Sequence, residues 1–373
     1  MEEIITADAL QGLKALPDGM ADTCVTSPPY YGLRDYNTAK WEGGDLDCNH
    51  TMPEREHDPK QTKGLIGNSH VSRYNKKTCH KCGAVRIDDQ IGLEQTPEGY
   101  IEKLVTVFRE VKRVLRDDGT LWVNIGDSYC SPATGSKSQG SSTLDGGKKS
   151  QIEASKRPDK NPNKDIKAKD LIGIPWTLAF ALRADGWYLR QDIIWHKPNP
   201  MPESVIDRCT KSHEYIFLLS KSRKYYFDSC AIREPATNPP TARNRGLNNP
   251  NTVLPNNSRR LSPGERAYNA DGARNKRDVW SVNTKPYSGA HFAAFPPNLI
   301  RPCILAGSRK GGTVLDPFFG SGTTGQVAIE EGRKFVGIEI NPDFVRLAEQ
   351  RIRRARNRRP QSMLGYELRE GME

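Results

Sequence analysis

The chain has no long apolar run and few cysteines. No stretch of its 373 residues approaches the roughly 20 apolar residues that a membrane-spanning helix needs. The first residues lack the charged-then-apolar pattern of a signal peptide. Eight cysteines are too few to cross-link a chain of this length, which fits a reducing compartment. We therefore expect a cytoplasmic protein that has no membrane partner.

Acidic residues are also in deficit, because 56 lysines and arginines face 45 aspartates and glutamates. The net charge of +11 favours a polyanionic partner, although such a charge sets attraction and does not set the fold. The length allows one large α/β domain with insertions or two smaller domains, and either can bury a substantial core. We find no internal repeat.

Three segments contain few apolar residues: 41–83, 131–168 and 233–284. The second is rich in Ser, Gly, Lys, Pro and Asn, so burial within it cannot offset the entropy cost of ordering, and we expect a flexible loop. Residues 233–277 hold nine lysines and arginines, nine asparagines and only three acidic residues. The three segments are expected to interrupt the core.

Elsewhere the apolar pattern alternates between strand and helix. Strands are predicted at residues 3–5, 23–25, 120–125, 188–195 and 215–219, and helices at 9–16, 96–115 and 174–185. A turn is predicted at Asp118-Gly119. Residues 312–352 read as a compact β-α-β-α unit, followed by six arginines between positions 351 and 359. This alternation predicts an α/β fold.

Two motifs follow short apolar runs that are expected to be buried strands. Thr26-Ser27-Pro28-Pro29-Tyr30 follows the run 23–25, and Asp316-Pro317-Phe318-Phe319-Gly320-Ser321-Gly322 follows the run 313–315. Ligands of open α/β sheets bind beyond the carboxyl ends of the strands. We therefore expect the two motifs to share one cleft, although roughly three hundred residues separate them.

The glycine loop 320–325 fits the pattern G-x-G-x-x-G, and Glu339 ends the next predicted strand. Glycines let the backbone approach a ligand, and such a carboxylate can bind ribose hydroxyls. By itself this pattern also fits a nicotinamide site or a tight packing turn. Asp316 directly after the strand, and the bulk of residues 317–319 before the first glycine, instead suit a cofactor with amino acid and adenosine ends and no phosphates.

The loop Ser27–Tyr30 offers a hydroxyl, carbonyls freed from regular pairing by two prolines, and an aromatic face. This set suits a planar substrate with an exocyclic amine, because the oxygens can accept the amine hydrogens while Tyr30 stacks on the ring. A proline-stiffened turn with a packing tyrosine is the alternative when the motif is taken alone.

In this order the motifs resemble those of the amino-methylating, S-adenosylmethionine-dependent DNA methyltransferases of the β class, in which the catalytic loop precedes the cofactor loop. The resemblance implies a Rossmann-like class I methyltransferase fold, with a mostly parallel seven-stranded sheet and a permuted motif order. It assigns catalysis to Ser27, Pro28, Pro29 and Tyr30, and the base pocket to Trp195 and Lys197. It assigns cofactor binding to Asp8, His291, Phe295, Pro296, Asp316, Phe318, Gly320, Gly322, Thr323, Thr324 and Glu339.

The implied reaction is direct methyl transfer to the amine of a base that is flipped out of double-stranded DNA. The family tends to place serine first in the catalytic loop for N4 of cytosine and aspartate for N6 of adenine. Ser27 therefore favours cytosine, with N6-adenine methylation as the alternative. RNA or protein-amide methylation, and a non-catalytic DNA-binding protein, remain weaker alternatives. Ring-carbon methylation would need a cysteine nucleophile after a proline, but Cys303 lies in an apolar run and is expected to be core.

A second candidate site lies in the first polar segment. Cys48, His50, Cys79 and Cys82 offer four soft ligands, and Cys-x-x-Cys-Gly is a common half of a structural zinc site. His57 and His80 are alternative ligands. An insertion with so few apolar residues needs some other stabilisation, which favours zinc over free loop cysteines.

The expected organisation combines these assignments. The catalytic half comprises residues 1–40, 84–130 and 169–232, and the cofactor-binding half comprises residues 285–356. The remaining segments are the zinc-binding insertion 41–83, the flexible loop 131–168, the target-recognition segment 233–284 and the tail 357–373. Arg and Asn side chains suit base-edge reading, so recognition is placed at 233–284, whereas the other basic segments are expected to contact phosphates. A prokaryotic or phage origin is expected, and a homodimer stays open.

Overall fold

The computed structural model describes the parts of the chain that form regular structure. These are residues 2–32, 40–45, 47–50, 78–79, 81–87, 90–130, 166–167, 169–235, 273–284 and 295–358. Several predictions concern residues outside this set. They include His57, His80, His291, the tail beyond 358, nearly all of the expected flexible loop 131–168 and most of the expected recognition segment.

The central element is an eight-stranded sheet in the order β1-β12-β11-β2-β5-β7-β6-β10. Its strands are β1 (Glu2–Thr6), β12 (Lys334–Glu339), β11 (Thr313–Asp316), β2 (Ala21–Thr26), β5 (Leu115–Ile125), β7 (His213–Ser220), β6 (Tyr188–His196) and β10 (Val279–Ser281). Neighbours from β1 to β5 pair in parallel, as do β6 and β10, whereas β6 and β7 are antiparallel.

The expectation of an α/β fold with a mostly parallel sheet is thus confirmed, and the expected seven strands are wrong for the described residues. The additional strand is β10, which contributes only three residues and lies in the segment assigned to target recognition. So short a strand carries no readable alternation. The turn predicted at Asp118-Gly119 is also wrong, because β5 continues through both residues.

The described residues also form helices and two small antiparallel ribbons. The helices are α1 (Ala9–Lys14), α2 (Pro97–Val114), α3 (Ile174–Ala184), α6 (Pro297–Gly307), α7 (Thr323–Glu330), α8 (Pro342–Arg358) and the 3-10 turn η1 (Cys230–Ile232); the ribbons pair β3 (Lys40–Glu42) with β4 (Val85–Ile87) and β8 (Glu234–Pro235) with β9 (Ala273–Arg274). None of these helices is both long and apolar enough to span a membrane.

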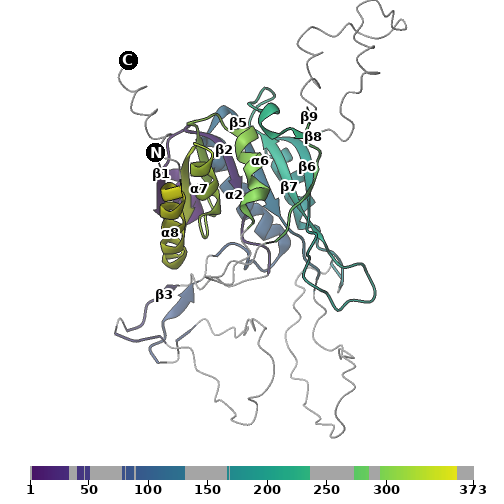
Figure 1. Cartoon of the computed structure of the whole chain (residues 1–373). Coiled ribbons are helices and arrows are strands. Elements are labelled where there is room, and N and C mark those ends of the chain that lie inside the picture. The colour runs from purple at the N-terminus through teal and green to yellow at the C-terminus, as the bar shows by residue number, and fades with distance from the viewer. Residues whose placement is uncertain are drawn as a thin grey trace, which may run out of the picture. The chain divides into compact units, whose positions relative to one another are not determined.

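The chain divides into two compact units, of which the first comprises Met1–Ser27, Arg109–Asn124 and Gly186–Glu373 and holds nearly all of the sheet. Its core brings together side chains of the sheet and of α6, α7 and α8, including Trp122, Phe335 and Ile304. Figure 1 shows β1 beside α8, so the two ends of the described chain meet in this unit. The second unit comprises Pro28–Phe108 and Ile125–Asp185. The domain boundaries proposed from the sequence stay predictions.

Candidate functional site

The strands that precede the two motifs are neighbours in the sheet. β2 and β11 run parallel, with Val314 opposite Thr23 and Leu315 opposite Cys24. Where the strands end, the Thr26 hydroxyl donates a hydrogen bond of 2.6 Å to the Asp316 carboxylate. Ser27, which starts the proline-rich motif, follows directly. The sequence thus brings the start of one motif to the start of the other by strand pairing.

Asp316 is buried, with 1% of its surface exposed. Its carboxylate accepts hydrogen bonds from the hydroxyls of Thr26 and Thr324, the latter at 2.7 Å, and from the Phe318 backbone N–H at 3.0 Å. Burial raises the pKa of Asp316 to about 6, the nearby Glu339 charge adds to this rise, and the three hydrogen bonds oppose it. Thr324, assigned to cofactor binding, therefore orients this carboxylate directly.

Glu339, at the end of β12, holds the glycine loop by its backbone. Its two carboxylate oxygens accept hydrogen bonds of 2.8 Å from the N–H groups of Gly320 and Asn341. Burial raises the pKa of Glu339, and the backbone donors oppose this effect. The carboxylate thus fixes the distance between the loop after β11 and the end of the neighbouring strand.

The two glycines of the loop have different roles. Both have positive φ, +50° at Gly320 and +78° at Gly322. A Cβ atom at Gly322 would lie 2.8 Å from the Cβ atom of Ala348, so this glycine permits α7 and α8 to pack closely. A Cβ atom at Gly320 would meet no described atom closer than the Phe318 carbonyl at 4.0 Å. Among the described residues, none fills the space next to Gly320, which leaves room for a ligand.

The remaining side chains of the loop are partly structural. Phe319 is buried, stacks on Phe335 at 5.5 Å between ring centroids and covers Gly337, whereas Phe318 is only half-buried. The Thr323 hydroxyl accepts a hydrogen bond from Arg351 of α8. Ser321 belongs to the motif but was assigned no role from the sequence, and its buried hydroxyl has no hydrogen-bond partner among the described residues. Such a group is rare in native structures and fits a polar ligand atom.

The other residues assigned to the cofactor lie at helix starts. Asp8 is the N-cap of α1, and one carboxylate oxygen accepts from the N–H groups of Leu10 and Gln11 at 2.9 and 3.3 Å. Pro296 is buried directly before α6, and Phe295 packs against the core of the first unit. His291 lies outside the described residues.

The proline-rich loop continues into the second unit, where residues that the sequence did not single out contact it. Pro28 is buried, and Pro29 and Tyr30 are half-buried. The Tyr100 hydroxyl donates a hydrogen bond of 2.7 Å to the Pro29 carbonyl. A Cβ atom at Gly92 would lie 2.9 Å from the Tyr30 carbonyl. Helical spacing marks Tyr100 only as a buried position, so no sequence signal pointed to this contact.

The two residues assigned to the base pocket lie at the end of β6. Trp195 is buried, with 4% exposure, and its indole N–H donates to the Val282 carbonyl at 2.8 Å. The Lys197 ammonium lies 4.4 Å from the centre of the Trp195 ring and forms an ion pair with Glu214 of β7. Both side chains thus have protein partners, and Trp195 belongs to the core.

Cys303 is core, as expected, because it has no exposed surface. Burial raises the pKa of its thiol well above the ordinary value. A thiol that resists ionisation in this way is a poor nucleophile, which argues against methylation of a ring carbon.

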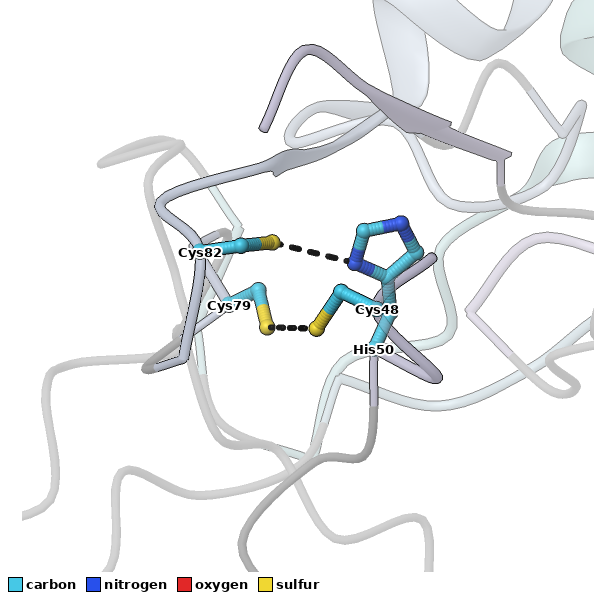
Figure 2. A group of neighbouring side chains, drawn as sticks. All are labelled: Cys48, His50, Cys79 and Cys82. Atoms are coloured by element: carbon cyan, nitrogen blue, oxygen red, sulfur yellow. Dashed lines mark hydrogen bonds between the residues drawn. The ribbon is translucent and has the colours of Figure 1, made fainter. Parts of the chain in front are cut away.

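The four soft ligands of the polar insertion come together in the second unit. Figure 2 shows the side chains of Cys48, His50, Cys79 and Cys82 pointing toward one another, and their ligand atoms all lie within 4.8 Å of one another. A hydrogen bond from the His50 side chain is the main cause that lowers the pKa of Cys79 to about 6. The cluster can therefore hold a metal ion.

The backbone around this cluster is constrained. His50 has a φ of +33°, an uncommon conformation for a residue other than glycine, and its ring stacks on Trp41 of β3 at 5.2 Å between centroids. A Cβ atom at Gly44 would lie 2.7 Å from the Cys82 sulfur. Sequence reasoning found the four ligands and missed Trp41 and Gly44, which pack around them.

Comparisons with known proteins agree with these motifs. The family model described as DNA methylase, of the N6/N4 type, matches residues 21–350. The type II methyltransferase M.Cfr9I of Citrobacter freundii is 43% identical, over 94% of this chain and 87% of its own length. M.SmaI of Serratia marcescens, also a type II methyltransferase, is 43% identical, over 95% and 91%.

Among solved structures, the PvuII DNA methyltransferase (cytosine-N4-specific) superposes with a TM-score of 0.52 at 16% identity, covering 94% of this chain and 85% of that one. This likeness supports the fold. The family match and the two close relatives identify the chain as a member of the N6/N4 DNA methylase family, an S-adenosylmethionine-dependent DNA methyltransferase of the amino-methylating type.

Proposed function

We propose that this enzyme transfers the methyl group to N4 of cytosine in double-stranded DNA. The observation that carries the choice of base is Ser27, a neutral hydroxyl at the position where the resemblance places aspartate in adenine enzymes. Among the described residues, no group donates a hydrogen bond to the Ser27 hydroxyl or to the Pro28 carbonyl. Two acceptors are therefore available for the two hydrogens of an exocyclic amine.

These acceptors would act on a base that has left the stack, since the amine cannot be reached inside a duplex. Hydrogen bonds from the amine to Ser27 and Pro28 direct its lone pair toward the methyl donor, and the half-buried Tyr30 ring stacks on the base. The cofactor supplies a methyl group on a positively charged sulfur. When bound, it would supply this methyl group to the amine nitrogen: the sulfur–carbon bond would break with its electron pair left on sulfur, the nitrogen–carbon bond would form, and one amine proton would be lost to solvent.

The cofactor is proposed to lie along the loop after β11. The open space at Gly320 and the unpartnered Ser321 hydroxyl fit a ligand there. Asp316 lies directly before this loop and Glu339 at the end of the neighbouring strand β12, and both accept hydrogen bonds from nearby donors, so their carboxylates are preorganised. The other proposed contacts are Asp8, His291, Phe295, Pro296, Phe318, Gly322, Thr323 and Thr324.

The Cys/His cluster is proposed to bind a structural zinc ion. Four tetrahedral ligands with zinc–sulfur bonds of about 2.3 Å would place two sulfurs about 3.8 Å apart. The sulfurs of Cys48 and Cys79 are 3.8 Å apart, and the Cys82 sulfur lies 3.3 Å from Nδ1 of His50. A site with four protein ligands is closed, so we assign it to stability and to the presentation of the insertion, and not to catalysis.

Recognition of the DNA sequence is proposed for residues 233–284, with Trp195 and Lys197 beside the base. The described ends of this segment meet in the β8–β9 ribbon, where Glu234 accepts from Arg274 and Arg277 at 2.9 and 2.6 Å. The intervening Arg- and Asn-rich residues therefore begin and end at one place on the first unit. Arg and Asn are suited to reading guanine and adenine edges.

The test of this function is the identity of the product. Duplex DNA is incubated with the enzyme and S-adenosylmethionine that carries a deuterated methyl group, digested to nucleosides and analysed by mass spectrometry. We expect labelled N4-methylcytosine. Labelled N6-methyladenine would overturn the choice of base, and label on the cytosine ring carbon would overturn the proposed chemistry.

A further inference from the structure

Residues 90–100 form a support behind the proline-rich loop. They belong to the same compact unit as Pro28, Pro29 and Tyr30. Two backbone carbonyls of the loop are contacted, one by a phenol hydroxyl and one by a glycine that leaves no room for a side chain. Neither of the contacting residues, Tyr100 or Gly92, is itself assigned to substrate or cofactor.

Tyr100 lies in the first turn of α2 and has no exposed surface. Its hydroxyl donates to the Pro29 carbonyl at 2.7 Å, and its ring lies 5.5 Å from that of Tyr31, measured between centroids. The Tyr31 hydroxyl in turn donates to the Gln95 carbonyl at 3.2 Å. The start of α2 thus holds the loop both at Pro29 and just beyond Tyr30.

Gly92 makes the second contact. It has a φ of +102°, and a Cβ atom there would meet the Tyr30 carbonyl at 2.9 Å. Its carbonyl accepts a hydrogen bond from the Gly32 N–H, and its own N–H donates to Glu94, both at 2.8 Å. The Glu94 side chain is buried, and one of its oxygens lies 3.1 Å from the Lys103 ammonium. Gly92 is therefore held on both sides while it touches the loop.

We propose that Tyr100 and Gly92 are positioning residues for methyl transfer, an inference that rests on the proposed role of the loop Ser27–Tyr30. The Pro29 carbonyl accepts a hydrogen bond from the Tyr100 hydroxyl, which fixes the orientation of the peptide after Pro29. The amine of the base is then expected to donate to the Pro28 carbonyl. Gly92 determines how closely the Tyr30 backbone can approach residues 90–100. Because a misplacement of about 1 Å can cost about 100-fold in rate, this support determines the rate of the chemical step.

The first variant is Tyr100→Phe, which removes the hydroxyl and keeps the ring. Single-turnover methyl transfer to DNA should slow about 10-fold, which corresponds to one hydrogen bond, while the affinity for S-adenosylmethionine stays within about twofold. Tyr225→Phe is the matched control, because it removes a hydroxyl that accepts from Arg190 at an exposed place in the other unit. It should transfer methyl groups at the wild-type rate.

The second variant is Gly92→Ala, whose added Cβ atom meets the Tyr30 carbonyl. The transfer rate should fall about 10- to 100-fold with cofactor affinity retained. Gly19→Ala is its control, because Gly19 also has a positive φ but no described atom lies within 4 Å of an added Cβ. The control places alanine at a positive φ without a close contact and should leave the rate within about twofold.

The double variant Tyr100→Phe with Ser27→Ala distinguishes a positioning role of Tyr100 from a merely structural one. If Tyr100 acts through the loop, the double variant should be hardly slower than Ser27→Ala alone, because residues that act as a unit are not additive. Multiplied losses would overturn the positioning role. Wild-type rates in both Tyr100→Phe and Gly92→Ala would overturn it as well, provided that Tyr30→Ala is impaired; a fully active Tyr30→Ala enzyme would instead overturn the proposed role of the loop.

Discussion

Thr26 and Asp316 are joined by a hydrogen bond of 2.6 Å although 290 positions separate them in the chain. Thr26 ends β2 and precedes the proline-rich loop, and Asp316 ends β11 and precedes the glycine loop. Parallel pairing of the two strands alone would align their ends only approximately. The hydrogen bond ties the starts of the two loops to each other.

Removing the Thr26 hydroxyl should therefore destabilise the first unit. Thr26→Val leaves one lone pair of a buried carboxylate without its donor, which should lower the free energy of unfolding by about 1 to 3 kcal/mol. Thr106→Val is the control, because its exposed hydroxyl donates only to a carbonyl of its own helix, that of Glu102. Chemical denaturation measures both variants. Equal stability of the two would mean that the Thr26–Asp316 bond contributes nothing.

Asp316 should also make the stability depend on pH. Its folded-state pKa of about 6 lies above the ordinary value of 3.8, so the folded protein binds this proton more tightly than the unfolded chain does. The free energy of unfolding should therefore fall as the pH rises from about 4 to about 6, by up to about 3 kcal/mol, and this loss is complete above that window.

Asp316→Asn isolates this effect, because the amide does not titrate. The stability of the variant relative to wild type should rise across the same pH window in denaturation curves measured at each pH, while the titration of groups that do not interact with Asp316 cancels. A difference that stays constant between pH 4 and 7 would show that burial does not raise the pKa of Asp316.

Gly320→Val should abolish cofactor binding, because the side chain enters the open space next to the loop. Binding of DNA should persist. Gly311→Val is the matched control, since Gly311 has a φ of +77° and, in the part of the chain that the structure describes, no atom lies within 4 Å of an added Cβ. Calorimetric titration with S-adenosylmethionine should detect no binding for the first variant and wild-type affinity for the second. Unchanged affinity in Gly320→Val would refute the placement of the cofactor.

Purified enzyme should contain about one zinc ion per chain, and Cys79→Ser combined with Cys82→Ser should remove it, because thiolates provide much of the stability of such a site. Cys209→Ser with Cys230→Ser is the control, since both of those thiols are exposed and lie outside the cluster. Elemental analysis of protein prepared without chelator gives the answer. Absence of zinc from the wild-type protein would show that the four residues are ordinary loop side chains and not zinc ligands.

The sequence predicted the parts of this fold that depend on local pattern. The apolar runs before Ser27 and Pro317 gave two strands, and the rule that ligands lie beyond strand ends placed both motifs at one edge of the sheet. The ligand spacing of the insertion likewise predicted a cluster that the structure brings together. These signals are read from a few consecutive residues.

The parts that could not be predicted depend on distant contacts. The contact of Tyr100 with Pro29 joins residues 71 positions apart. The helical spacing of apolar residues predicts only that Tyr100 is buried in the core. Trp195 was assigned to the base pocket by resemblance, and no local pattern indicates its hydrogen bond to the Val282 carbonyl, 87 positions away. The strand β10 is too short to show a period and forms only because β6 offers it an edge.

The most direct test of the account is the methyl-transfer rate of Tyr30→Ala in a single turnover, measured on DNA beside the affinity for S-adenosylmethionine. Loss of base stacking is worth about 1 to 3 kcal/mol by alanine substitution, so the rate should fall about 5- to 160-fold. Cofactor affinity should stay within a few fold, because the glycine loop is unchanged. Transfer at the wild-type rate by Tyr30→Ala would contradict the account, because the base would then bind elsewhere.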